Sequence, residues 1–352
     1  YESLDTSLST QFVGYDKLIE DSVITALTTE KEVVQALADG DKGTIVVEQT
    51  PFYATMGGQV GDKGIIKTNE GTFVVVDTIK LHGTMVGHVG YVSEGMIQVG
   101  DKVTLKVDSA NRNAIAKNHS ATHLLQKALK LVLGNHVEQA GSYVDAERLR
   151  FDFTHFQAMT PEEIEKVEAL VNEQIENGLD VVTEEMSLED AKKTGAMALF
   201  GEKYGDKVRV VSMGDYSIEL CGGTHVSNTR NISAFKIISE SGVAAGVRRI
   251  EALTGKALFE YYNTMESELQ EAAKLLKAVP LEVSAKVVSL QDEVKQLQKE
   301  NDKLKAKLAK EAAGDLLSEA KEVDGIHILT KQLTDVDMNG MSDSVSYTHL
   351  RA

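Results

Sequence analysis

Two pairs of potential metal ligands, far apart in the chain, restrict the fold of this sequence more than any other feature. His119 and His123 lie in the segment NHSATHLLQKAL, and Cys221 and His225 lie in CGGTH. On a helix, two residues four positions apart leave the same face about 5–6 Å apart at Cβ. The glycines between Cys221 and His225 permit a tight loop around a ligand. Either pair alone is weak evidence, because unrelated histidines often show the same spacing.

Together the pairs offer one thiolate and three imidazoles, a donor set that suits tetrahedral zinc better than magnesium or calcium. We therefore expect one Zn²⁺ per chain, bound by His119, His123, Cys221 and His225. The histidine pair lacks the glutamate of an HExxH motif, which disfavours a zincin-type metalloprotease. Two alternatives stay open for Cys221, a nucleophile activated by a histidine and an ordinary small buried side chain.

Short β-rich runs separated by glycines precede the first histidine pair, and they predict a β-barrel domain over residues 1–108. The apolar spacing then changes to a helical period, which predicts a helix over residues 114–133. Thr160, followed by a proline and two acidic residues, predicts a second helix from Pro161 to about Glu176. With strand signals in VRVVSM and SAFKIIS, we expect an α+β domain over residues 109–254.

Residues 255–322 are rich in Ala, Glu, Lys, Leu and Gln, and Pro280 divides them into two expected helices. The second helix carries apolar residues at alternating steps of four and three, typical of a coiled-coil seam, with Asn301 at an a position. The seam comprises Val287, Leu290, Val294, Leu297, Asn301, Leu304 and Leu308. An intrachain hairpin, a homodimer and packing on the chain's own globular part all satisfy the pattern.

Residues 323–352 begin with a strand-like run, HILTKQL, and we interpret them as the truncated start of a C-terminal domain. The final nine residues, SVSYTHLRA, show no periodicity and are interpreted as an artefact. The sequence also starts at Tyr1 without a methionine and enters in mid-pattern. We therefore expect a fragment that lacks an upstream portion.

Charge and hydropathy exclude several classes of function. The net charge of −17 argues against a general nucleic-acid coat, since nonspecific affinity depends on lysine and arginine, so any RNA contact must be local. There is no apolar run of about 18 residues and no signal-peptide pattern at the start. We expect a cytoplasmic protein with neither a membrane nor DNA as a partner.

Several segments, in order, resemble motifs of bacterial alanyl-tRNA synthetase: TPFYATMGGQVGDKG, NHSATHLLQKAL, HVEQAGSYV, ELCGGTHV and GVRRIEALTG. The resemblance covers roughly Phe12 to Thr254, and the helical segment is similar to the region that comes after these motifs in that family. The related editing domain of threonyl-tRNA synthetase has similar ligand pairs, but the CGGTH spelling favours the alanine family. The resemblance implies an α+β fold class: a small β-barrel, a zinc-dependent α+β editing domain and a long helical coiled coil.

The resemblance also implies an activity, the zinc-dependent hydrolysis of Ser-tRNA(Ala) and Gly-tRNA(Ala), with the tRNA(Ala) acceptor end as the partner. It places Gln139 and Cys221 in the catalytic site. It assigns substrate or tRNA contacts to Gly57, Gly58 and Gln59, and phosphate contacts to Arg248 and Arg249, whose guanidinium forks suit phosphate. ATP and Mg²⁺ would serve only an aminoacylation domain that we do not find in this sequence.

Proofreading is physically necessary in such a family. A pocket shaped for a methyl side chain cannot exclude glycine, and it rejects an added hydroxyl only about a hundredfold. Three alternatives remain. One is a noncatalytic tRNA-binding and dimerisation module with structural zinc, and another is a free-standing alanyl-tRNA editing hydrolase. A zinc phosphoesterase is weaker, because no aspartate-rich metal motif accompanies the histidines.

Overall fold

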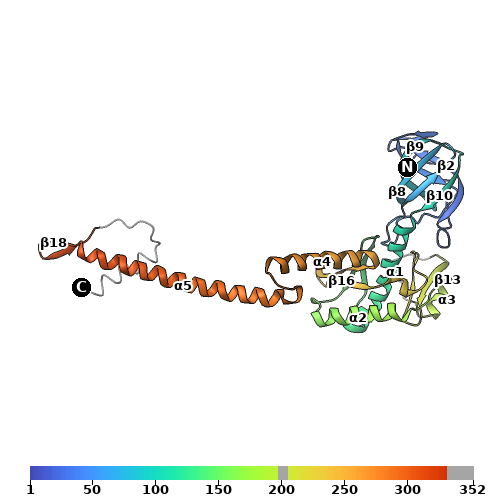
Figure 1. Ribbon diagram of the computed structural model, residues 1–352. Coiled ribbons are helices and arrows are strands. Elements are labelled where there is room, and N and C mark those ends of the chain that lie inside the picture. The colour runs from blue at the N-terminus through green and yellow to red at the C-terminus, as the bar shows by residue number, and fades with distance from the viewer. Residues whose placement is uncertain (197–204, 331–352) are drawn as a thin grey trace. The chain divides into compact units, whose positions relative to one another are not determined.

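The computed structural model describes residues 1–196 and 205–330, with side chains 312–318 excepted. It divides the chain into two compact units, residues 1–262 and residues 263–352. The first unit contains the β-barrel and an α+β region (Figure 1). The partition into four domains that the sequence suggests stays a prediction.

Six antiparallel strands close the barrel. Their order is β10 (Lys102–Val107), β7 (Gly64–Lys67), β8 (Gly71–Lys80), β9 (Val86–Gln98), β5 (Lys42–Val47) and β2 (Ile19–Thr28), and β10 pairs back with β2. Alternation creates the core: in β10, Val103, Leu105 and Val107 are buried while the intervening residues are exposed. The sequence-based prediction of a barrel is confirmed. The short strands β1 (Gln11–Phe12), β3 (Val33–Val34), β4 (Ala36–Ala38) and β6 (Gln49–Thr50) flank it.

Helix α1 (Ser109–Leu133) leaves the barrel directly and starts before the expected residue 114. Its beginning is set by Asp108, whose side chain accepts a hydrogen bond from the Asn111 backbone at 3.1 Å. The apolar periodicity starts only at Ile115, so the pattern missed the first turn. From there to Leu129 the helix is buried on nearly every side.

Helix α1 and helix α2 (Pro161–Asn177) pack on a four-stranded antiparallel sheet. The order in this sheet is β11 (Gln139–Val144), β12 (Leu149–Thr154), β17 (Val247–Thr254) and β16 (Phe235–Ala244). Leu124, Phe151 and Val167 meet in one core. The predicted start of α2 is confirmed, since Thr160 and Glu163 form a reciprocal capping box.

A second, three-stranded sheet supplies the other half of the ligand set. It consists of β13 (Val181–Ser187), β14 (Lys207–Met213) and β15 (Ser217–Leu220), accompanied by helix α3 (Leu188–Lys193) and the 3₁₀ turn η1 (Thr229–Ile232). Cys221 follows β15 immediately, so the end of this strand fixes where the CGGTH loop begins.

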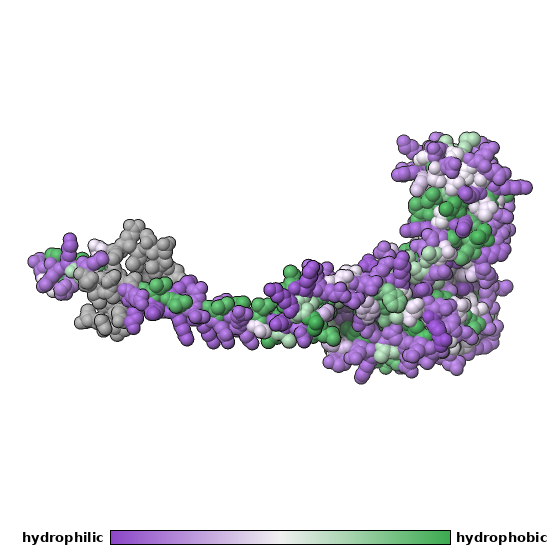
Figure 2. Space-filling model, viewed as in Figure 1, coloured by the Kyte–Doolittle hydropathy of each residue, from purple (hydrophilic) through white to green (hydrophobic). Residues whose placement is uncertain are grey.

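Helix α4 (Gly255–Leu275) runs from the first unit into the second, which continues with η2 (Pro280–Glu282) and α5 (Val283–Ser318). The expected pair of helices around Pro280 is therefore present. The apolar seam residues of α5 are exposed in the single chain, and Figure 2 shows apolar side chains along this helix. A coiled-coil partner stays a prediction.

Strands β18 (Lys321–Val323) and β19 (Ile326–Ile328) form a hairpin, and β19 overlaps the start of the predicted HILTKQL strand. The rest of that run and the final nine residues lie outside the described residues. None of the helices in the described part of the chain is long and apolar enough to cross a membrane.

Candidate metal centre and adjoining pocket

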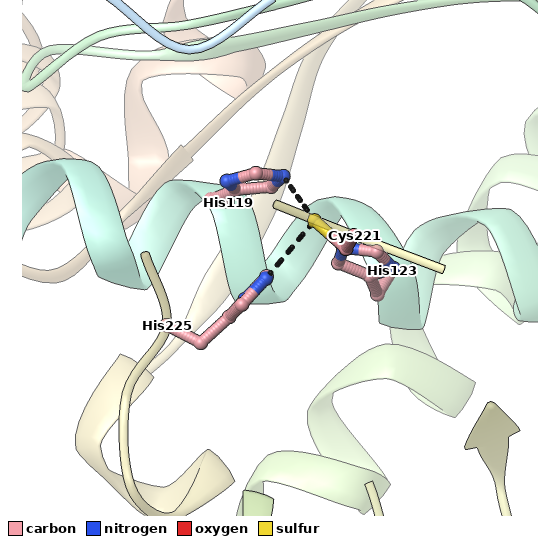
Figure 3. A group of neighbouring side chains, drawn as sticks. All are labelled: His119, His123, Cys221 and His225. Carbon is pink, nitrogen blue, oxygen red and sulfur yellow. Dashed lines mark hydrogen bonds between the residues drawn. The ribbon is translucent and has the colours of Figure 1, made fainter. Parts of the chain in front are cut away.

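The structure brings both ligand pairs together. His119 and His123 come from α1, and Cys221 and His225 come from the loop after β15; their ligand atoms all lie within 4.8 Å of one another (Figure 3). The Cys221 Sγ atom is 3.4 Å from His119 Nε2 and 3.3 Å from His225 Nε2. The four side chains thus converge on one point.

The spacing fits zinc. With zinc–sulfur bonds of about 2.3 Å and zinc–nitrogen bonds of about 2.0–2.1 Å, neighbouring sulfur and nitrogen ligands of a tetrahedral site lie about 3.5 Å apart. The two sulfur–nitrogen distances are close to this value. In addition, His123 Nε2 is buried without a hydrogen-bond partner in the described structure, as expected of an atom reserved for a metal.

Each histidine is oriented by a partner on its other ring nitrogen. Gln59 Oε1 lies 2.7 Å from His119 Nδ1, Ser120 Oγ lies 3.0 Å from His225 Nδ1, and Glu219 Oε1 lies 3.2 Å from His123 Nδ1. Such partners fix the ring orientation of metal-binding histidines and leave the second nitrogen for the ion. All three Nε2 atoms are therefore available at the cluster.

The electrostatics favour a thiolate at the centre. Burial raises the pKa of the Cys221 thiol, but the imidazoles of His119, His225 and His123 outweigh burial and bring the pKa well below its ordinary value. Burial lowers the pKa of His225 to about 3. At His123 burial is opposed by Glu219 and Cys221, and the pKa rises well above the ordinary range. A metal ion bound at His123 would displace that proton.

The CGGTH loop needs a glycine at Gly223. A Cβ atom there would stand 2.0 Å from His119 Cε1 and 2.3 Å from His119 Nδ1, so any side chain would push the imidazole away. At Gly222 a Cβ atom would meet only the flexible end of Met56, at 3.3 Å. Close approach of the backbone to His119 therefore explains one of the two glycines.

Two residues that the sequence analysis did not identify donate hydrogen bonds to the backbone of this loop. The Tyr15 hydroxyl donates to the Gly222 carbonyl at 2.5 Å, and Arg209 donates to the Gly223 carbonyl at 2.5 Å. The Arg209 guanidinium also lies over the Tyr15 ring, 3.8 Å from its centroid. No local sequence motif predicts such contacts, because Tyr15 and the loop are far apart in sequence.

A pocket of about 420 Å³ opens beside the cluster. Its lining includes His119, His123 and Cys221, together with the polar side chains of Gln126, Gln139 and Ser142. Gln139 is the first residue of β11. Gln139 and Cys221, the expected catalytic pair, therefore line one cavity, and their catalytic role stays a prediction.

The three residues of the GGQ segment, Gly57, Gly58 and Gln59, have different surroundings. Gly57 lines the pocket, with open space where a Cβ would lie, while Gly58 packs against the Ser142 backbone. Gln59 is fully buried: it donates to Thr224 Oγ1 at 2.8 Å and accepts from the Thr224 backbone at 2.9 Å, besides contacting His119. In this structure Gln59 organises the site from behind the ligands.

Arg248 and Arg249 lie on β17 and are outside the pocket lining. Both guanidinium forks are engaged by carboxylates: Arg248 binds Glu240 at 2.5 and 2.9 Å, and Arg249 binds Asp152 at 2.7 and 2.9 Å. A phosphate would have to displace these carboxylates, so phosphate binding by either arginine stays a prediction.

Comparison with known proteins gives two family matches. Residues 1–111 match the model of class II (A) tRNA synthetases, and residues 208–251 match the second additional domain of threonyl and alanyl tRNA synthetases. The second match contains Cys221 and His225, and the first contains the barrel.

Full-length relatives agree with these matches. The chain is 58% identical to alanine–tRNA ligase 1 of Lachnoclostridium phytofermentans over 341 residues. This match covers 97% of the chain and 39% of the relative. It is 46% identical to the alanine–tRNA ligase of Acetivibrio thermocellus (98% of the chain, 39% of the relative) and 48% identical to that of Nitrosomonas eutropha (96% and 39%). The chain thus spans about two fifths of the length of these relatives.

Proposed function

Because this chain belongs to the alanyl-tRNA synthetase family, we propose that its metal centre and pocket hydrolyse tRNA(Ala) charged with the wrong amino acid, serine or glycine. The observation that carries the proposal is the convergence of His119, His123, Cys221 and His225, the first three of which line a pocket that also contains Gln139. A metal centre beside an open cavity with several polar side chains in its lining suits a reaction on a bound ester better than a buried structural role.

The residues of the site have different proposed roles. The four-residue cluster would hold one Zn²⁺, which when bound supplies a Lewis acid that activates water or fixes the substrate. Gln59, Ser120 and Glu219 keep the imidazoles in place before the ion arrives. Gln139 offers its amide to the ester within the cavity, and the substrate is already an activated ester, so orientation is the main requirement.

We further propose that attachment of alanine, with its ATP and Mg²⁺, is not performed by the residues of this chain. The RNA partner would be the acceptor end of tRNA(Ala), presented to the pocket. The exposed seam of α5 is proposed to mediate a homodimer. Because the proposed role belongs to protein synthesis, we propose the cytoplasm as the cellular location.

A second candidate is a noncatalytic tRNA-binding module with structural zinc. The observation in its favour is that four ligand atoms converge, since a fully closed tetrahedral site leaves no position for water or substrate. The two candidates differ in one result, because a structural site cleaves no ester.

The test is deacylation of tRNA(Ala) bearing serine, glycine or alanine by the zinc-loaded chain and by Cys221→Ala. We expect the wild type to release serine and glycine faster than alanine, and the variant to lose at least about a hundredfold in rate. Circular dichroism and zinc content measured on the same samples separate loss of metal from loss of fold. A folded, zinc-loaded wild type that cleaves no seryl ester favours the structural role.

A further inference from the structure

One face of α1 forms a continuous wall of the pocket. His119, Thr122, His123 and Gln126 follow the spacing i, i+3, i+4 and i+7, and all four line the cavity. The first and third are metal-ligand candidates. Gln126 lies one turn beyond His123, about 4.5 Å farther along the helix axis at a rise of about 1.5 Å per residue.

The side chain of Gln126 is mostly buried, but its amide lacks a partner in the described part of the chain. Its relative exposure is 6%, and neither end of its amide has a hydrogen-bond partner among the described residues. The amide is not among the fully buried unpaired groups, so it reaches the open space of the cavity and is available to a bound ligand. Its neighbour on the same face differs, because the Thr122 hydroxyl already donates to the Asn118 carbonyl at 2.8 Å.

The chemistry of the amide indicates what it binds. A glutamine side chain is neutral and both donates and accepts, so it matches a hydroxyl group, which also does both. A phosphate or carboxylate would instead favour the cationic wall of the pocket at Lys207 and Arg209.

We propose that the Gln126 amide binds a hydroxyl group of the aminoacyl end of the RNA substrate, next to the metal centre. The inference rests on the proposed editing function and extends it to a residue that selects the substrate. Two hydroxyls share this chemistry: the side chain of a misattached serine and a hydroxyl of the terminal ribose.

The test compares zinc-loaded wild type with Gln126→Met, which keeps the length of the side chain and removes both hydrogen-bonding groups. Lys127→Met, on the next position and outside the pocket lining, is the matched control. Deacylation of seryl- and glycyl-tRNA(Ala) is measured in parallel. Loss of one hydrogen bond corresponds to roughly a tenfold fall in kcat/KM.

The serine and glycine arms identify the source of the hydroxyl. A fall that is larger for the seryl than for the glycyl ester assigns the contact to the serine side chain, and an equal fall assigns it to the ribose. If Gln126→Met loses no more than Lys127→Met on either substrate, the proposal is wrong. Gln126→Leu, which also lacks both hydrogen-bonding groups, replaces the methionine variant if that protein melts early or lacks zinc.

A binding measurement tests the contact of Gln126 independently of the proposed editing activity. The probes are adenosine derivatives that carry serine or glycine through a non-hydrolysable 3′-amide, titrated by calorimetry into the full chain. A roughly tenfold weaker binding by Gln126→Met supports the hydroxyl contact even if the wild type cleaves no ester, in which case only the editing function fails. Equal binding by wild type and variant overturns the contact.

Discussion

At the scale of single residues, the site depends on one position without a side chain. Gly223 lies against His119, and an added Cβ would displace the imidazole. We therefore predict that Gly223→Ala weakens zinc binding by about 10–100-fold, the usual consequence of disturbing the orientation of a ligand. Competition with a chromogenic chelator measures the change. Gly222→Ala is the control, and similar affinities in the two variants would contradict the steric argument.

His88 gives a second residue-scale prediction, in the barrel core. Its Nδ1 donates to the Ile45 carbonyl at 2.8 Å, so Nε2 accepts from the Thr50 hydroxyl at 2.7 Å and the ring is neutral. Burial lowers its pKa from 6.5 to about 4. Between these values the unfolded chain binds the proton and the folded chain does not, so stability falls as the pH decreases through this window.

The contribution of His88 is fully present above about pH 6.5 and declines by roughly 3 kcal/mol towards pH 4, given about 1.4 kcal/mol for each pKa unit. Urea unfolding of wild type and His88→Gln at several pH values measures the difference between the two slopes. Because both proteins share the histidines of the metal centre, their effect cancels. Parallel curves for the two proteins would show that His88 is not the responsible group.

The same residues show how far a sequence can predict a site. The ligands were identifiable because helical spacing and a glycine loop are local properties, and the structure brings all four together. The role of Gln59 in orienting His119 could not be predicted in this way, because its amide contacts His119 and Thr224, which lie 60 and 165 positions away in the sequence. Glu219 was overlooked although it stands two residues before Cys221, because nothing local distinguishes an orienting carboxylate from a surface one.

At the scale of elements, the start of α2 was predictable from its capping residues, whereas the capped start of α1 and the pairing partners of the strands were not. Thr160 and Pro161 mark the start of α2 correctly. For Arg248 and Arg249 the sequence shows only adjacent cations, whereas the fold places Glu240 and Asp152 against them through strand pairing. Tertiary pairing therefore decides whether an arginine is available to a ligand.

Helix α5 carries the element-scale prediction. Its seam residues are exposed in the single chain, and Asn301 interrupts them at an a position. If a second helix covers the seam, Asn301→Leu removes a buried amide and should raise the melting temperature or change the oligomeric state. Sedimentation and thermal melting are the measurements. Lys303→Leu, outside the seam, is the control, and identical behaviour of wild type and Asn301→Leu would show that the seam has no helical partner.

At the scale of the first unit, a buried ion pair joins the barrel to α1, the helix that carries His119 and His123. The Arg112 guanidinium, on α1, binds Asp62 at 2.5 Å and also donates to the carbonyls of Gly14 and Pro51 at 2.7 and 2.8 Å. Asp62 in turn accepts from the Tyr53 backbone at 2.7 Å. Because Gln59 belongs to this same barrel segment and contacts His119, the ion pair and the metal centre share one support.

We predict that Arg112→Met destabilises the folded chain by about 3–5 kcal/mol, because it leaves the Asp62 carboxylate buried without its cation. The double variant Arg112→Met with Asp62→Leu should recover part of this loss, since both charges are then absent. Urea unfolding of the single and double variants measures the stabilities, and chelator competition under folding conditions measures zinc affinity. If the barrel positions α1 through this contact, zinc affinity falls in the single variant although neither residue is a ligand. If the variant is destabilised but binds zinc as tightly as the wild type, the metal centre assembles independently of the barrel. In that case the contact between Gln59 and His119 follows from the geometry of the metal centre and does not stabilise it.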